Sequence, residues 1–99
     1  MNIQILSNVS KFLEGLSRED DAKIAAHLKS LAMDQTDGLA IKPLKGKIKE
    51  LIVRQYRIVF FKIGDSGYVV DVFRKQSKKT PKRTIERAER IYRDINAKQ

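Results

Sequence analysis

The chain of 99 residues contains no cysteine and no tryptophan, and it has only two prolines and one histidine. Without cysteine it forms neither a disulfide framework nor a thiolate metal site, which agrees with a reducing cytoplasm. No apolar run approaches the roughly 18 residues that a membrane span needs, and no signal-peptide pattern opens the chain. We therefore expect one cytoplasmic domain over residues 1–99, with no membrane partner, and the sequence indicates neither a metal nor a cofactor.

The single histidine and the acidic residues of the N-terminal part are explained by helix structure. His27 lies at the edge of an apolar stripe formed by Ile24 and Leu31 at helical spacing. Ser17 precedes three acidic residues, a pattern typical of a helix start because the helix dipole favours negative charge there. These residues therefore predict a packed helix, and they give little reason to expect a catalytic acid or base.

The net charge of +9 is concentrated in the C-terminal part of the chain. Residues 1–41 hold four basic and six acidic residues, a net of −2; residues 42–73 hold seven and three, a net of +4; residues 74–99 hold ten and three, a net of +7. A basic part beside a mildly acidic one is typical of a protein that binds a polyanion. The alternative is a charged surface that only keeps the protein in solution.

The predicted strands are rich in β-branched and aromatic residues. Ile48–Phe61 is interpreted as the central strand, followed by a polar turn at Gly64–Gly67 and a second strand at Tyr68–Phe73. If these two strands pair with Ile63 opposite Tyr68, Arg57 lies opposite Arg74. A third, short strand is predicted at Ile3–Leu6 from a weaker signal.

Helices and one long loop complete the expected secondary structure. A short helix is expected after Ser7 or Asn8, and a longer one from a cap at Ser17 to about Met33. Asp34–Lys47 is predicted to be irregular because Gly and Pro interrupt it. The clearest helix follows, with Thr80 as its cap and proline as its first residue.

Basic residues gather where the second strand ends and the last helix begins. Six of the ten residues from Arg74 to Arg83 are Lys or Arg, and none is acidic. Like charges facing each other on a sheet, or at the positive end of a helix, are unfavourable for folding. A bound phosphate would relieve both repulsions, because backbone amides and lysines at a helix start bind phosphate together. The pattern therefore predicts a phosphate-binding site.

The order of motifs in Lys42–Ile91 resembles the HigB-type, phage-derived branch of the RelE superfamily of toxins. The motifs are Glu50-Leu51, Tyr56-Arg57 followed by aromatic residues, and Phe73-x-Lys75…Lys79-Thr80-Pro81. The paired opening helices are also similar, so the resemblance extends over nearly the whole chain. Two positions depart from the family pattern: Ile52 stands where members often have arginine, and Gln76 where they have a second lysine.

This resemblance implies a small α+β fold, in which N-terminal helices pack on a twisted antiparallel sheet and a C-terminal helix follows. It also implies metal-independent cleavage of messenger RNA on the ribosome, and neutralisation by an antitoxin that is commonly a helix-turn-helix protein. The catalytic candidates are Arg57, Lys75 and Arg54. The candidates for RNA and phosphate binding are Lys42, Lys45, Lys47, Arg74, Lys78, Lys79, Lys82, Arg83 and Tyr56.

Two further interpretations remain open at this stage. The same basic residues would serve a non-catalytic RNA- or DNA-binding module, or a subunit that docks an acidic protein partner. Charge alone does not separate these classes, whereas the order of the motifs favours the endonuclease. A small helix-turn-helix protein encoded directly beside this chain would support the toxin interpretation.

Overall fold

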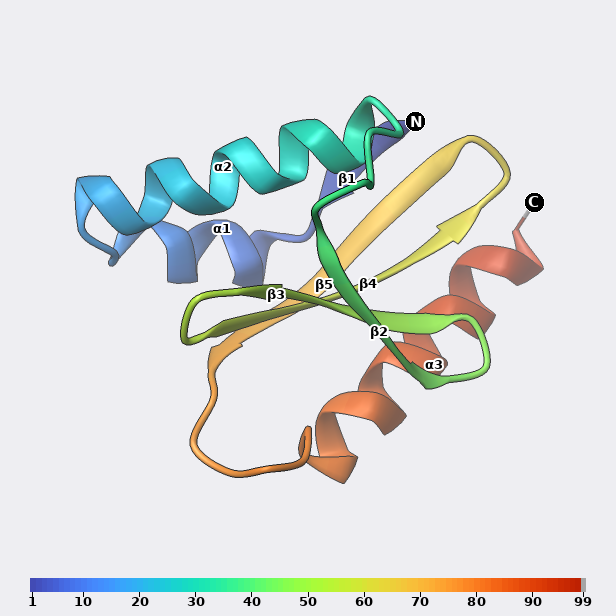
Figure 1. Cartoon of the computed structure of the whole chain (residues 1–99). Coiled ribbons are helices and arrows are strands. Elements are labelled where there is room, and N and C mark those ends of the chain that lie inside the picture. Colours follow the sequence, from blue (N-terminus) through green and yellow to red (C-terminus); the bar gives the residue numbers. More distant parts are fainter. Residues whose placement is uncertain (99) are drawn as a thin grey trace.

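The computed structural model describes residues 1–98, which form a five-stranded sheet and three helices (Figure 1). The strands lie in the order β1-β5-β4-β3-β2. No helix of residues 1–98 is both long and apolar enough to cross a bilayer. The elements are β1 (Asn2–Ile5), α1 (Ser7–Glu14), α2 (Arg18–Ala32), β2 (Ala40–Lys45), β3 (Ile48–Val53), β4 (Tyr56–Ile63), β5 (Ser66–Arg74) and α3 (Lys82–Ala97).

The α+β class is confirmed, but the expected antiparallel sheet is in fact mixed. The short N-terminal strand is present, one residue earlier than predicted, and it precedes the helices and pairs parallel with β5. Gly67 leaves room for two side chains at the N-terminus, because a Cβ there would lie 2.9 Å from Ile3 Cδ1 and 2.9 Å from Met1 Sδ. A side chain at position 67 would therefore displace the ends of these two side chains.

The predicted strand Ile48–Phe61 is wrong as a single element, because it is a hairpin of β3 and β4. Arg54 and Gln55 form the turn, and Arg54 has a φ of 55°. A left-handed turn residue is usually Gly, Asn or Asp, so an arginine between two apolar runs gave no turn signal. The region Asp34–Lys47, predicted to be irregular, contains the edge strand β2.

The predicted antiparallel pairing of β4 with β5 is confirmed, but its predicted register is wrong. The connection is tighter than expected, with Ile63 opposite Ser66, and the register shifts once between Val59 and Phe60. Arg57 therefore lies opposite Phe73 and not opposite Arg74. The repulsion between two facing arginines does not exist, and it gives no support for a phosphate site.

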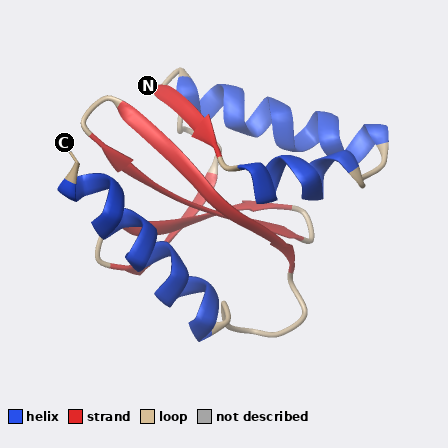
Figure 2. Ribbon diagram, turned by 180° about the vertical axis from the view of Figure 1, so that it is seen from behind, coloured by secondary structure: helices blue, strands red, loops and turns tan. Residues whose placement is uncertain are grey.

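Helices cover the two faces of the sheet unequally. Helices α1 and α2 pack on one face and α3 packs on the other (Figure 2). The core under α1 and α2 includes Leu51, Ile58 and Phe60, whereas the core under α3 includes Val59 and Phe61. Since neighbouring residues of a strand point to opposite faces, Arg57, which is two residues from Val59, lies on the α3 face.

The helix starts follow the predictions in one case and depart in the other. Ser17 caps α2, since its hydroxyl accepts a hydrogen bond from the backbone N–H of Asp20 at 3.1 Å. The predicted cap at Thr80 is wrong: α3 begins at Lys82, Pro81 takes the cap position, and no side chain caps the helix. The first turn of α3 has no acidic residue, so the positive end of its dipole remains uncompensated there.

Candidate functional site

A carboxylate buried in the sheet is the centre of the candidate site. Glu50 on β3 is 4% exposed and is the one charged residue buried in the described part of the chain. Its Oε1 lies 3.2 Å from Nε of Arg57 on β4. The two positions are diagonal neighbours, because Ile52 is directly opposite Arg57 in the register. Strand pairing therefore fixes the backbone of both partners.

The Arg57 guanidinium is held on two of its three nitrogens. Nη1 donates hydrogen bonds to the carbonyl oxygens of Arg54 at 2.8 Å and Tyr56 at 2.9 Å, and Nε contacts Glu50. Within residues 1–98 no hydrogen bond from Nη2 is recorded, and the side chain is 11% exposed. Arg57 on β4 is thus a preorganised cation whose Nη2 group is left as a donor for an anionic ligand.

The loop from β5 to α3 closes over this pair. The hydroxyl of Thr80 donates a hydrogen bond to Oε2 of Glu50, which brings residues 75–81 against β3. A cavity of about 50 Å³ remains between them. It is lined by Lys42, Glu50, Ile52, Arg57, Phe73, Lys75, Ser77, Lys78, Lys79 and Thr80. We call these residues the Arg57 pocket; its five basic side chains face a single carboxylate.

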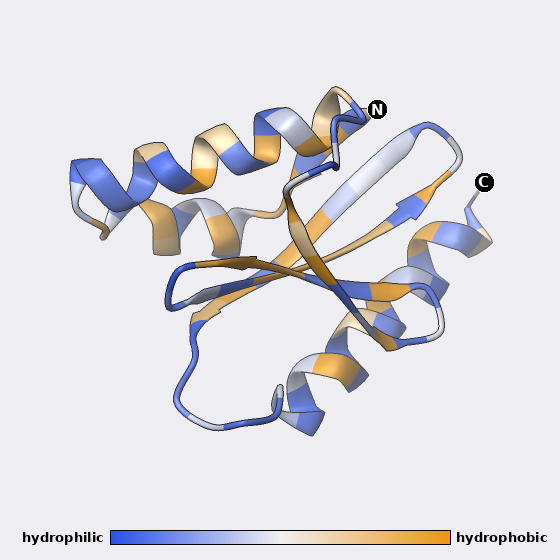
Figure 3. Ribbon diagram, viewed as in Figure 1, coloured by the Kyte–Doolittle hydropathy of each residue, from blue (hydrophilic) through white to orange (hydrophobic). Residues whose placement is uncertain are grey.

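Two of the four lysines in the Arg57 pocket have a fixed backbone: Lys42 pairs with Glu50 in the sheet, and Lys75 is attached to the β3–β4 turn. The backbone N–H of Lys75 donates to the carbonyl oxygen of Gln55 at 2.8 Å, so β5 remains attached to the β3–β4 turn just as it leaves the sheet. Lys78 and Lys79 lie on the exposed loop, which Figure 3 shows as hydrophilic. Lys75 therefore combines a fixed backbone with an exposed side chain beside Arg57.

A second, wider cleft of about 700 Å³ adjoins the Arg57 pocket. The two share Phe73, Ser77 and Lys79, and Gln76 lines only the wider cleft. Both departures from the family pattern therefore lie here: Ile52 in the Arg57 pocket and Gln76 beside it. The pocket and the cleft are therefore neighbours that share one wall.

Several of the predicted site residues lie elsewhere. Arg54 points to α2, where its Nη1 is 3.4 Å from Glu19 and 3.6 Å from Asp20. Lys45 and Lys47 lie at the other end of the β2–β3 hairpin, and Lys45 pairs with Glu89 of α3 at 3.4 Å. The residues at the start of α3 do not line the Arg57 pocket; these are Lys82 and Arg83, both exposed.

The prediction that Tyr56 binds RNA is wrong for its ring, which is 1% exposed in the core under α1 and α2. The ring packs edge-on against Phe12 with centroids 6.2 Å apart, so no base reaches its face. Its hydroxyl donates to Asp20 at 2.6 Å. Arg74 lies 5.5 Å above the ring, and its hydrogen bond to the Tyr56 hydroxyl is the main cause that raises the pKa of its guanidinium.

Tyr56→Phe should lower the free energy of unfolding by about 1–2 kcal/mol and leave any RNA cleavage within about twofold of wild type. The change removes a hydrogen bond to a carboxylate but keeps the buried ring. Tyr68→Phe is the matched control, because within residues 1–98 no hydrogen bond of the Tyr68 hydroxyl is recorded. Urea denaturation measures both; equal stability of the two variants would show that the Asp20 contact contributes nothing.

Glu50 and Thr80 were missed as functional residues by sequence reasoning. Both residues stand in the family motifs, and Thr80 is also the predicted helix cap, but neither motif nor cap assigns them a role in the site. The sequence does contain one signal. Ile48 and Glu50 are two residues apart in a predicted strand, so their side chains point to the same face, and the apolar Ile48 indicates that this face is buried. A buried charge needs a partner, which would have directed attention to an arginine on the neighbouring strand.

Comparison with known proteins identifies one family. The family model described as "Phage derived protein Gp49-like (DUF891)" matches residues 11–93. The match includes both strands that carry Glu50 and Arg57, as well as the loop to α3. A search of curated proteins finds no match to the chain.

Proposed function

The chain belongs to the phage-derived Gp49-like family, a toxin-like family related to the RelE and HigB toxins, and from this premise we propose that it is the toxin of a type II toxin–antitoxin system that cleaves messenger RNA on the ribosome. The observation that carries the proposal is the Arg57 guanidinium, fixed by Glu50 and two backbone carbonyls among four lysines. A cationic site of this kind fits a phosphodiester substrate.

The proposed reaction uses the nucleophile that RNA carries itself. The 2′-hydroxyl attacks the adjacent phosphorus and loses its proton, the bond from phosphorus to the 5′ oxygen breaks, and that oxygen takes up a proton. The products are a 2′,3′-cyclic phosphate and a 5′-hydroxyl. Negative charge grows on the non-bridging oxygens in the transition state, and preorganised donors there lower the barrier. Nη2 of Arg57 is the proposed donor, with Lys75 as its companion.

The remaining basic residues serve to hold RNA in this proposal. Lys42, Lys78 and Lys79 line the Arg57 pocket, and their exposed side chains supply phosphate contacts that position the strand without reading its sequence. Phe73 is half-buried at the junction of the pocket and the wider cleft. An RNA chain that leaves the pocket would pass over it into the cleft.

A non-catalytic RNA-binding module is the second candidate function. Ile52 favours it, because this apolar residue faces Arg57 where related toxins often carry a further arginine. The Arg57 pocket then binds a phosphate but supplies one cation fewer to the transition state. We retain the endonuclease as the first proposal because Arg57 is held rigidly, which phosphate binding alone does not require.

Induced expression of the chain in bacteria should stop growth and reduce translation, and primer extension should detect new cuts within open reading frames. Co-expression of a co-encoded antitoxin, which we propose to be a helix-turn-helix protein, should restore growth. Growth arrest without cuts would replace the endonuclease by the binding module. Uninhibited growth at confirmed expression would contradict the toxin proposal itself.

A further inference from the structure

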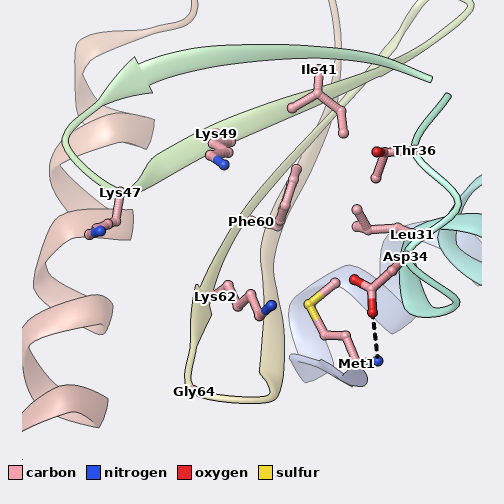
Figure 4. Close-up of a pocket in the computed structure, with 10 residues that line it drawn as sticks. All are labelled: Met1, Leu31, Asp34, Thr36, Ile41, Lys47, Lys49, Phe60, Lys62 and Gly64. Atoms are coloured by element: carbon pink, nitrogen blue, oxygen red, sulfur yellow. Dashed lines mark ion pairs between the residues drawn. The ribbon is translucent and has the colours of Figure 1, made fainter. Parts of the chain in front are cut away.

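A second basic hollow lies on the opposite face of the sheet from Arg57. It has a volume of about 380 Å³ and lies where α2 ends (Figure 4). Leu31 and Phe60 line it with apolar side chains, and Lys47, Lys49 and Lys62 lie along the side formed by the β2–β3 turn, β3 and β4. We call it the lysine hollow.

Strand geometry separates the lysine hollow from the Arg57 pocket. Lys49 is directly opposite Phe60 in the register, and Lys62 follows Phe60 by two residues, so these side chains share the face covered by α2. Glu50, the next residue after Lys49, points to the other face and holds Arg57. A ligand in the hollow therefore does not occupy the proposed catalytic site.

The lysines of the hollow have no counter-charge within the described part of the chain. No ion pair of Lys47, Lys49 or Lys62 within 4.0 Å is recorded among residues 1–98, although Lys45 nearby pairs with Glu89. The one acidic residue that lines the hollow, Asp34, is 3.6 Å from the amino group of Met1 (Figure 4). Like charges on paired strands are unfavourable, so an anionic occupant would stabilise this surface.

We propose that the lysine hollow is the docking site for an acidic segment of a partner protein that inserts an apolar side chain between the lysines. Phe60 is 4% exposed and Leu31 is 3% exposed, so the hollow offers no aromatic face on which a base stacks, and its accessible apolar lining comes from the half-buried side chains of Met1 and Ile41. Carboxylates on either side of one apolar side chain match the lysines and the apolar floor. This step rests on the proposed function: the partner is then the antitoxin, which would bind the toxin through the face opposite its catalytic pocket.

The test uses a fluorescein-labelled synthetic peptide of Leu-Glu-Glu-Leu repeats and the full chain, with binding measured by fluorescence anisotropy at low ionic strength. Lys49→Glu/Lys62→Glu should weaken binding by about tenfold or more, because two attractive charges become repulsive. Lys11→Glu/Lys23→Glu changes the net charge equally on exposed residues of α1 and α2 and should stay within about twofold of wild type. A peptide with serine in place of leucine should bind about tenfold more weakly.

Three results would overturn the docking site: no peptide binding to the wild-type chain, equal weakening by both double variants, or retained binding of the serine peptide. If Lys49→Glu/Lys62→Glu instead abolishes binding of single-stranded RNA and not of the peptide, the hollow is a nucleic-acid surface. Arg57→Lys should leave peptide binding unchanged. Normal peptide binding with no RNA cleavage by the wild-type chain would defeat the proposed function alone, whereas cleavage without peptide binding would defeat the docking site alone.

Discussion

Arg57→Lys should reduce cleavage of ribosome-bound messenger RNA by about 10²-fold or more, while the protein keeps most of its free energy of unfolding. Lysine retains a positive charge beside Glu50, but it lacks the Nη2 donor that we propose contacts the scissile phosphate. Loss of one preorganised transition-state donor has an effect of this size. Single-turnover cleavage on programmed ribosomes measures the rate, and urea denaturation measures the stability.

Lys75→Ala should reduce cleavage by a similar factor, because Lys75 is the companion of Arg57 whose backbone is fixed to the β3–β4 turn. Lys45→Ala and Lys82→Ala are the controls, since both side chains are exposed and lie outside the Arg57 pocket. These two should cut within a few-fold of wild type. If Arg57→Lys and Lys75→Ala cut normally while a control variant does not, the site is assigned to the wrong residues.

Glu50→Ala should lower the free energy of unfolding by about 3 kcal/mol, the second large effect that we expect. The substitution leaves the Arg57 cation, 11% exposed, without its counter-charge, and it also removes the acceptor for Thr80. Removing one partner of a buried ion pair commonly costs 3–5 kcal/mol. Arg57→Ala should be destabilising for the same reason, which is why Arg57→Lys is the better test of chemistry.

Glu86→Ala is the control for Glu50→Ala, because Glu86 forms only an exposed ion pair with Lys82 at 3.8 Å on α3. Its loss should change stability by less than about 0.5 kcal/mol. Glu50→Leu/Arg57→Leu should recover much of the stability lost in Glu50→Ala but should abolish cleavage, since apolar pairs often replace buried ion pairs without destabilisation. Equal unfolding curves for Glu50→Ala and Glu86→Ala would contradict a structural role for the Glu50–Arg57 pair.

Local signals predicted the helices well because each signal lies within a few residues of the structure it determines. The Ser17 cap and the apolar stripe from Ile24 to Leu31 predicted α2. The apolar face of α3, which includes Ala88 and Tyr92 at helical spacing, packs on the sheet. The start of α3 was less predictable, because Thr80 bonds to Glu50, a residue distant in the sequence.

Strand pairing could not be read from the sequence for two physical reasons. Arg54 adopts a left-handed conformation without the glycine or asparagine that usually marks such a turn. The connection between β4 and β5 is two residues tighter than predicted, and the register shift between Val59 and Phe60 recovers only one of these two residues, so Arg57 lies opposite Phe73 and not opposite Arg74. The candidate site was therefore predicted in its central residues, Arg57 and Lys75, but not in the carboxylate that holds Arg57.

The most direct test of the central proposal is the chemical nature of the new ends after wild-type protein has cut a defined messenger RNA on purified ribosomes. Attack by the 2′-hydroxyl, with Arg57 stabilising the charge on the phosphate, predicts a 2′,3′-cyclic phosphate on the upstream fragment and a 5′-hydroxyl on the downstream one. A 3′-hydroxyl with a 5′-phosphate, or no cleavage by protein that is folded and bound to the ribosome, would contradict it.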